Sequence, residues 1–322
     1  MSVPELVDQA RAGRSRAVGR LISLVEDSSP LLREVMAALA PHGGHAQVVG
    51  ITGSPGVGKS TTTNALVGAL RAAGRRVGVL AVDPSSPFSG GALLGDRIRM
   101  QDHASDPGVF IRSMASRGHL GGLAWSTPQA LRVLDAAGYD VVLVETVGVG
   151  QSEVDVAALA DTTMVLLAPG MGDGIQAAKA GILEIGDLYV VNKADRDGAD
   201  RVRRELRGML ALGQRRPDAW QPPILPTVAQ TGQGIEDVVA ALGEHRTHLE
   251  ATGELQRRRE RRAREEVEAI AVTALRQRWG RLQGRADLDE LAADVVAGRT
   301  DPYAAADALV AAVTRAGESA PA

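Results

Sequence analysis

Short apolar runs that end at polar or glycine-rich turns occupy the middle of the chain. Helix-length stretches separate them, and each run is apolar on both faces. This arrangement is typical of buried parallel strands in a series of βαβ units. We therefore predict an α/β fold with a mainly parallel sheet covered by helices on both faces. The predicted strands lie at residues 47–52, 76–83, 139–145, 162–168, 188–192 and 224–227.

Apolar residues recur at spacings of three and four at both ends of the chain. Over residues 4–40 this periodicity predicts two amphipathic helices, separated by a short polar segment from Asp27 to Pro30. Near the other end, we interpret the charge-dense run at 254–266 as a solvated helix face. An apolar stripe follows it and is expected to be buried against a second subunit. The stripe consists of Val267, Ile270, Ala271, Leu275, Trp279 and Leu282.

These changes of pattern divide the chain into three parts. We predict an N-terminal helical segment at residues 1–44, an α/β domain at 45–243 and a C-terminal helical extension at 244–322. A last helix is expected at the stretch "TDPYAAADALVAAV" (300–313), with Thr300 or Asp301 as its N-cap and Pro302 in its first turn.

Composition and charge exclude several classes of protein. The 322 residues contain no apolar run long enough to span a membrane. The 36 basic and 39 acidic side chains provide no overall field that would hold nucleic acid. There is no cysteine, which excludes disulfides, thiolate zinc sites and iron–sulfur ligands. With no apolar signal core near the first residues, we expect a cytoplasmic protein that binds neither membrane nor nucleic acid.

A glycine-rich loop follows the first predicted strand and runs into a predicted helix that ends near Gly74. That context is what a phosphate-binding P-loop requires. Its glycines let backbone N–H groups surround a β-phosphate, Lys59 reaches the β- and γ-phosphates, and Ser60 offers its hydroxyl to Mg²⁺. The predicted nucleotide-binding residues of this loop are Gly53, Ser54, Pro55, Gly56, Val57, Gly58, Lys59, Ser60 and Thr61.

The base of the nucleotide is predicted from the sequence "NKAD" at residues 192–195, directly after a strand. The Asp195 carboxylate can accept hydrogen bonds from guanine N1–H and the 2-amino group, a pair of donors that adenine lacks. We expect Asn192 to tie this loop to the P-loop, and the Lys193 stem to lie along the base. A further loop, with Val228 and Ala229, can offer the Ala229 N–H to the guanine oxygen. The predicted ligand is GTP.

Another strand is followed by "ETVGVGQSE" at residues 145–153. Glu145 lies where a carboxylate can support the waters around Mg²⁺, and Gly148 can present its N–H to the γ-phosphate. The sequence leaves the general base open among Asp83, Gln151 and Glu153.

Asp83 ends the second predicted strand and is therefore directed to the carboxyl edge of the sheet, where ligands bind. It opens the glycine-rich segment 83–100, which carries Asp96. A long segment of this kind in a compact domain is usually functional, so we interpret it as a candidate switch.

Together these motifs resemble the MeaB/ArgK family, the G-protein chaperones of adenosylcobalamin-dependent acyl-CoA mutases such as methylmalonyl-CoA mutase. The similarity extends from about residue 16 to 313. It implies a P-loop GTPase of the SIMIBI class with a C-terminal dimerisation arm, hence a homodimer. It also implies a role in delivering intact cobalamin cofactor to the mutase and removing damaged cofactor. The motifs are "VDPSSPFSGGALLGDRIRM" (82–100), "ETVGVGQSE" (145–153), "PGMGDGIQAAKAGILEIGDLYVVNKAD" (169–195) and "DPYAAADALV" (301–310).

The resemblance also assigns residues. Asp83, Asp96 and Glu145 match the family's metal and catalytic carboxylates, and the loop at about 170–181, with Lys179, resembles its additional switch. The partner mutase is expected to raise a slow intrinsic hydrolysis. The expected catalytic residues are Lys59, Asp83, Asp96, Glu145 and Gln151, and the expected metal ligands are Ser60, Asp83, Asp96 and Glu145.

Three other functions remain open at this point. A metal-insertion GTPase for nickel enzymes shares the same core, and two histidine pairs, His42/His45 and His245/His248, have ligand-like spacing. A kinase is the second alternative, suggested by an old name of the family as an arginine transport ATPase. The third is a scaffold in which the nucleotide is structural.

Overall fold

The structure is a computed structural model, which describes residues 2–84, 103, 105–116, 126–146, 152–170, 182–212, 219–279 and 286–318. The chain divides into two compact units, Met1–Arg259 and Glu260–Ala322. The first unit contains the predicted sheet and every predicted site residue.

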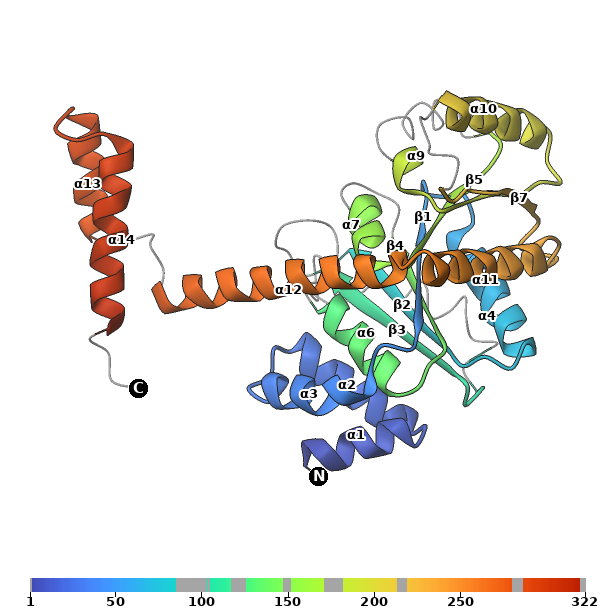
Figure 1. The fold of residues 1–322 in the computed structure, drawn as a ribbon, viewed down its shortest axis with the longest axis horizontal. Coiled ribbons are helices and arrows are strands. Elements are labelled where there is room, and N and C mark those ends of the chain that lie inside the picture. Colours follow the sequence, from blue (N-terminus) through green and yellow to red (C-terminus); the bar gives the residue numbers. More distant parts are fainter. Residues whose placement is uncertain are drawn as a thin grey trace. The chain divides into compact units, whose positions relative to one another are not determined.

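Seven strands form one sheet in the order β3-β2-β4-β1-β5-β6-β7, and all their pairings are parallel (Figure 1). The central strands are buried at every residue, which is why they appear in the sequence as continuous apolar runs. The predicted parallel sheet is confirmed. The strands are β1 (Gln47–Thr52), β2 (Val77–Pro84), β3 (Val109–Ser116), β4 (Val141–Thr146), β5 (Thr162–Leu167), β6 (Leu188–Asn192) and β7 (Ile224–Thr227).

The sequence pattern did not predict β3. This strand lies at the edge of the sheet and pairs only with β2 among the described strands. Its middle residues, Arg112 and Ser113, are polar, and Arg112 donates from Nε to Glu26 in the N-terminal segment at 3.1 Å. An edge strand with a paired charge at its centre lacks the apolar run of its neighbours, so the pattern did not indicate it.

Helices cover both faces of the sheet. On one face, α4 (Lys59–Ala72) and α11 (Ile235–Ala251) pack against the residues of β1, β5 and β6 that point to that side. On the other face, α6 (Thr127–Ala136) covers β2 and β4, and α7 (Ser152–Leu159) packs against β1 and β4. On the same face, α10 (Ala199–Leu212) covers β5 and β6. A short helix, α9 (Ile182–Ile185), precedes β6.

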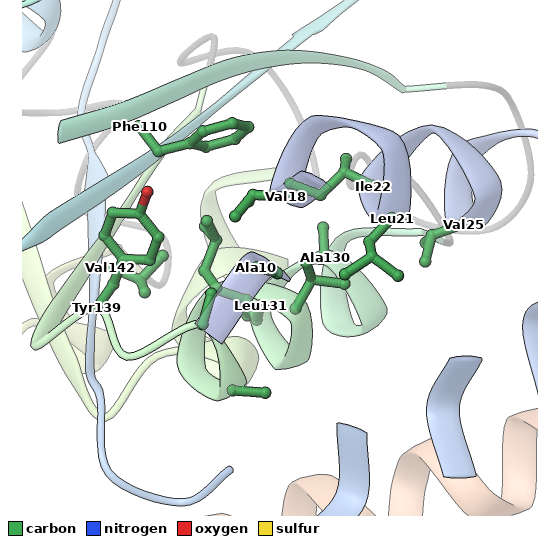
Figure 2. Packing of buried hydrophobic residues seen from close by; sticks show 14 of the residues in the cluster. Ala10, Val18, Leu21, Ile22, Val25, Phe110, Ala130, Leu131, Tyr139 and Val142 are labelled. Atoms are coloured by element: carbon green, nitrogen blue, oxygen red, sulfur yellow. The ribbon is translucent and has the colours of Figure 1, made fainter. Parts of the chain in front are cut away.

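The N-terminal segment forms three α-helices, where the sequence predicted two. These are α1 (Val3–Arg11), α2 (Ser15–Glu26) and α3 (Leu32–Leu39), followed by the 3₁₀ turn η1 (Ala40–His42). The extra break falls at Gly13, whose φ of +81° ends α1 without interrupting the apolar periodicity. Figure 2 shows Val18, Leu21 and Ile22 of α2 facing Ala130 and Leu131 of α6. The segment thus extends the core of the sheet domain.

Three helices complete the chain: α12 (Glu254–Trp279), α13 (Ala286–Val296) and α14 (Pro302–Glu318). The Asp301 carboxylate accepts the N–H groups of Tyr303 and Ala304 at 2.8 and 3.1 Å, which confirms Asp301 as the N-cap of α14. None of the helices in the described ranges is both long and apolar enough to cross a membrane.

Candidate active site

The carboxyl ends of the parallel strands bring the predicted site residues to one edge of the sheet. Ile51 of β1 is in register with Glu145 of β4, and β1 also pairs with β5, which is next to β6. The P-loop follows β1 and the "NKAD" loop follows β6, so both emerge at the edge where open α/β sheets bind ligands.

The P-loop has a backbone that requires glycine at two positions. Gly53 and Gly58 have φ values of +140° and +98°. A Cβ at Gly53 would overlap the Leu166 carbonyl oxygen, and one at Gly58 would overlap the Asn192 side-chain amide. The loop is therefore packed against β5 and β6 so closely that only glycine fits.

Lys59 is the first residue of α4 and is only 7% exposed. Its Nζ donates to the carbonyl oxygens of Gly53 at 2.7 Å and Ser54 at 3.2 Å. The ammonium group thus lies across the loop and is held by the loop's own backbone. A buried ammonium with carbonyl partners is the kind of group that a phosphate of the nucleotide can engage.

Glu145 lies at the end of β4, 4% exposed, and two hydroxyl groups of α4 contact its carboxylate. Ser60 Oγ donates to Oε1 at 2.6 Å, and Thr63 Oγ1 donates to Oε2 at 2.8 Å. The sequence predicted Ser60 and Glu145 as site residues but missed Thr63. The available signal was spacing, because residues three apart share one face of a helix.

Asn192 joins three loops at this edge. Its Nδ2 donates to the Val57 carbonyl at 2.9 Å, which is the contact with the P-loop that the sequence predicted. Its Oδ1 accepts from Thr227 Oγ1 at 3.2 Å and from the Ala229 N–H at 3.1 Å. In this structure the Ala229 N–H, expected to face the base, is thus bonded to Asn192.

The remaining residues of "NKAD" flank that junction. Lys193 has a φ of +56°, rare for a residue with a side chain, and its Nζ donates to the Gly56 carbonyl at 2.7 Å. Asp195 is exposed. A carboxylate in this position is accessible to a ligand that enters between the two loops.

The structure describes the backbone of one further predicted residue and does not describe four others. The backbone of Asp83 lies in β2 in register with Ala115, at the carboxyl edge beside β4. Asp96, Gly148, Gln151 and Lys179 lie outside the residues that the structure describes. Their assigned roles stay predictions.

The histidine pairs are separate from this site. His245 and His248 lie in the second half of α11. His245 is buried, and its Nδ1 is 2.9 Å from Thr162 Oγ1. Across the described ranges, no group of three histidine or acidic side chains is arranged to hold a metal ion.

Two features of this edge are typical of P-loop GTPases. One is the glycine-rich loop after the central strand of a parallel sheet, and the other is the second loop with Asn192 and Asp195. The protein is a P-loop GTPase. A sequence model described as "Methylmalonyl Co-A mutase-associated GTPase MeaB" matches residues 18–282. The chain belongs to this family.

Known relatives agree with that assignment. A protein of Pyrococcus abyssi named as a GTPase is 47% identical over 96% of both chains. The GTPase ArgK of Escherichia coli is 39% identical over 81% of both chains. A crystal structure described as an LAO/AO transport system kinase superposes with a TM-score of 0.74, at 29% identity and 97% coverage of both chains.

Proposed function

We propose that the protein is a GTP-dependent chaperone that assembles, protects and reactivates an adenosylcobalamin-dependent acyl-CoA mutase. The family to which the chain belongs is described as associated with methylmalonyl-CoA mutase, and this supports a mutase as the partner. The proposal is carried by the combination of that family match with a GTPase site whose loops are joined by the side chain of Asn192.

Nucleotide selection is proposed to depend on Asp195. Its exposed carboxylate would accept the N1–H and 2-amino donors of guanine, while Lys193 and Asn192 fix the loop against the P-loop. Xanthine carries a carbonyl acceptor where guanine has its 2-amino donor. Asp195→Asn should therefore weaken GTP binding by about 100-fold and improve binding of xanthosine triphosphate. Equal affinity of the wild-type protein for ATP and GTP in a competition assay would contradict the proposed guanine site.

Mg²⁺ fits the residues at the start of α4. The ion prefers oxygen ligands, and in nucleotide sites it is held by one or two side chains together with phosphate oxygens. The Ser60 hydroxyl and the Glu145 carboxylate lie side by side at the end of the P-loop. We expect Ser60 to hold the ion, with Asp83, Asp96 and Glu145 as the surrounding carboxylates. When bound, Mg²⁺ supplies positive charge that offsets the charge of the phosphates.

The residues of the chain would then bind and orient GTP. Lys59 would turn from the loop carbonyls to the β- and γ-phosphates, and the glycines would leave their N–H groups free to face the phosphates. We expect hydrolysis to be slow in the isolated protein and to be accelerated when the mutase completes the site.

The test of the chaperone role is the rate of GTP hydrolysis with and without each purified acyl-CoA mutase of the source organism. We expect the cognate mutase to raise turnover at least tenfold, and to be captured by the chain loaded with a non-hydrolysable GTP analogue. Lys59→Ala is the control, because it should abolish hydrolysis. If no mutase changed the rate or bound in any nucleotide state, the chaperone role would be wrong.

The second unit is proposed to hold two copies of the chain together. Several large apolar side chains of α12 are exposed, among them Val267, which is 66% exposed. Light scattering should give the mass of a dimer, and Val267→Glu combined with Ile270→Glu should give a monomer. A monomeric wild-type protein at micromolar concentration would contradict this arrangement. The large apolar side chains of α12 that are exposed in its described part are Val267, Ile270, Val272 and Leu275.

A further inference from the structure

Thr63 makes a contact that the GTPase motifs do not account for. It lies near the start of α4, is fully buried, and its hydroxyl is 2.8 Å from Oε2 of Glu145. The same hydroxyl is 3.0 Å from the carbonyl oxygen of Lys59. A hydroxyl has only one proton to donate, so the two acceptors compete for it.

The carboxylate is the stronger competitor. In a regular α-helix the Lys59 carbonyl already accepts the N–H of residue 63, so it does not depend on the hydroxyl. The Glu145 carboxylate is buried and also accepts from Ser60, and hydrogen bonds to an ionised carboxylate are about twice as strong as those to a neutral carbonyl. The Thr63 proton is therefore directed to Glu145.

Ser60 and Thr63 together hold both oxygens of one carboxylate. Ser60 Oγ lies 2.6 Å from Oε1. Thr63 lies about one turn further along the helix, and its hydroxyl donates to Oε2. Two donors from a rigid helix prevent rotation of the carboxylate about its last bond. Oε1 then stays next to the hydroxyl that is proposed to hold Mg²⁺.

We propose that Thr63 is a positioning residue, which fixes the Glu145 carboxylate beside Ser60 so that the site is preorganised for Mg²⁺ and nucleotide. The inference rests on the proposed magnesium site and adds a residue to it. Removing a group that hydrogen-bonds to a metal ligand and orients it typically lowers metal affinity by about 10- to 100-fold.

The neighbouring residue Thr62 provides a matched control. It is also fully buried near the start of α4, but its hydroxyl has no hydrogen-bond partner among the described residues. Thr62→Val and Thr63→Val make the same change in shape at adjacent positions. Only the change at Thr63 removes a contact with Glu145.

The experiment measures release of a fluorescent GDP analogue from the full chain across a range of Mg²⁺ concentrations and in excess chelator. For Thr63→Val, the Mg²⁺ concentration that gives half-maximal retention should rise about tenfold, and release in chelator should stay within about twofold of wild type. Thr63→Ser keeps the hydroxyl and should restore the wild-type response. Thr62→Val should match wild type.

Two outcomes would overturn the inference in different ways. If wild type retains GDP in a Mg²⁺-dependent manner and Thr63→Val responds identically, Thr63 has no positioning role, while the proposed site stands. If Mg²⁺ does not affect release from wild type, the magnesium site itself is wrong, and the role of Thr63 with it. Should Thr63→Val fail to fold, Thr63→Ala and Thr63→Ser make the same comparison, and equal Mg²⁺ dependence of those two variants would overturn the inference.

Discussion

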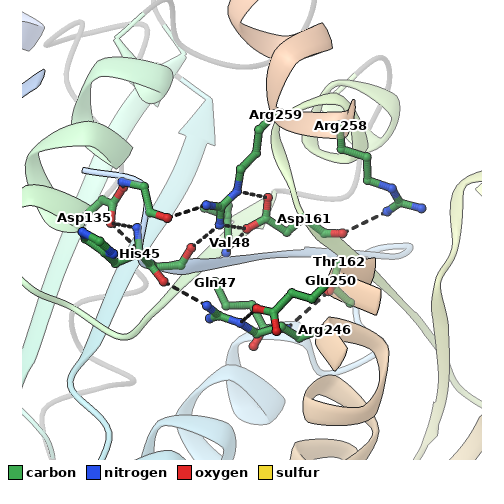
Figure 3. A network of polar contacts seen from close by, with 12 residues as sticks. His45, Gln47, Val48, Asp135, Asp161, Thr162, Arg246, Glu250, Arg258 and Arg259 are labelled. Atoms are coloured by element: carbon green, nitrogen blue, oxygen red, sulfur yellow. Dashed lines mark hydrogen bonds and ion pairs between the residues drawn. The ribbon is translucent and has the colours of Figure 1, made fainter. Parts of the chain in front are cut away.

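The Asp187 carboxylate accepts two hydrogen bonds from the guanidinium group of Arg258, at 2.9 and 3.0 Å. Asp187 directly precedes β6, and Arg258 lies near the start of α12. The next residue, Arg259, donates at 3.0 Å to Asp161, which directly precedes β5 (Figure 3). The start of α12 is thus fastened to the edge of the sheet where strands begin, opposite the edge that carries the nucleotide loops.

Removing Arg258 should destabilise the first unit. Arg258→Ala would leave the Asp187 carboxylate, 11% exposed, with the Thr163 N–H at 2.8 Å and the His245 ring at 3.4 Å as neighbours, and with no guanidinium group to offset its charge. We expect a loss of about 2–3 kcal/mol in the free energy of unfolding, since breaking one side of a buried ion pair leaves an uncompensated charge. Urea denaturation measures this change.

Arg257 is the matched control for that substitution. It belongs to the same charged run, but its side chain is 60% exposed and pairs with Glu254 on the helix surface. Arg257→Ala should cost less than about 1 kcal/mol. Equal effects of the two substitutions would contradict the anchoring role of Arg258.

Acid should destabilise the protein through His245. Burial lowers the pKa of His245 from the usual 6.5 to about 4, and Arg258 and His248 oppose its cationic form while Asp187 and Asp161 favour it. Because the unfolded chain binds a proton on this residue at a higher pH than the folded chain, stability falls as pH drops from about 6.5 towards 4. Between pH 7 and pH 5 the loss should be about 2 kcal/mol.

The contribution of His245 is isolated by comparing wild type with His245→Gln. Urea denaturation of both proteins at pH 7 and pH 5 gives the difference in pH dependence. The variant should lose about 2 kcal/mol less than wild type over this interval. If both proteins showed the same pH dependence, the lowered pKa of His245 would be refuted.

A methyl group at Gly58 should disrupt the junction of the two nucleotide loops. In Gly58→Ala the new Cβ would overlap the Asn192 amide, whose hydrogen bond to Val57 holds the P-loop. We expect a loss of more than about 3 kcal/mol in stability and no measurable GTP binding by calorimetry.

Gly74→Ala is the control that introduces backbone strain without a steric clash. The φ of Gly74, +78°, is also in the left-handed region, but a Cβ there would meet nothing within 4 Å. Gly74→Ala should cost only about 1–2 kcal/mol from strain and leave GTP binding unchanged. If Gly58→Ala behaved like Gly74→Ala, contact with Asn192 would not be the reason for the glycine.

The parallel sheet, its P-loop and its "NKAD" loop could be predicted because their signals are local. Buried strands such as β1 and β6 appear as continuous apolar runs, and the motif residues directly follow them. The position of a residue at a strand end then fixes the edge of the sheet at which it lies. Asn192 and Glu145 were found in this way.

The charge-dense run at residues 254–266 shows the limit of such signals. We expected a solvated face, and Arg257 agrees with that, but its neighbours Arg258 and Arg259 bind Asp187 and Asp161. The partners lie about 70 and 100 residues earlier in the chain. The sequence does not distinguish adjacent arginines of one helix from one another. Which of them contact buried carboxylates depends on how the helix packs in the folded chain.

Local patterns in the chain were enough to predict which strands are buried and where the phosphate loop begins, because these features depend on neighbours in the sequence. Only folding selected Thr63 and not Thr62 as the contact of Glu145, and made Asn192 the junction of three loops. Those contacts join residues separated by tens to more than a hundred positions. Their formation depends on the packing of strands and helices, which no local pattern specifies.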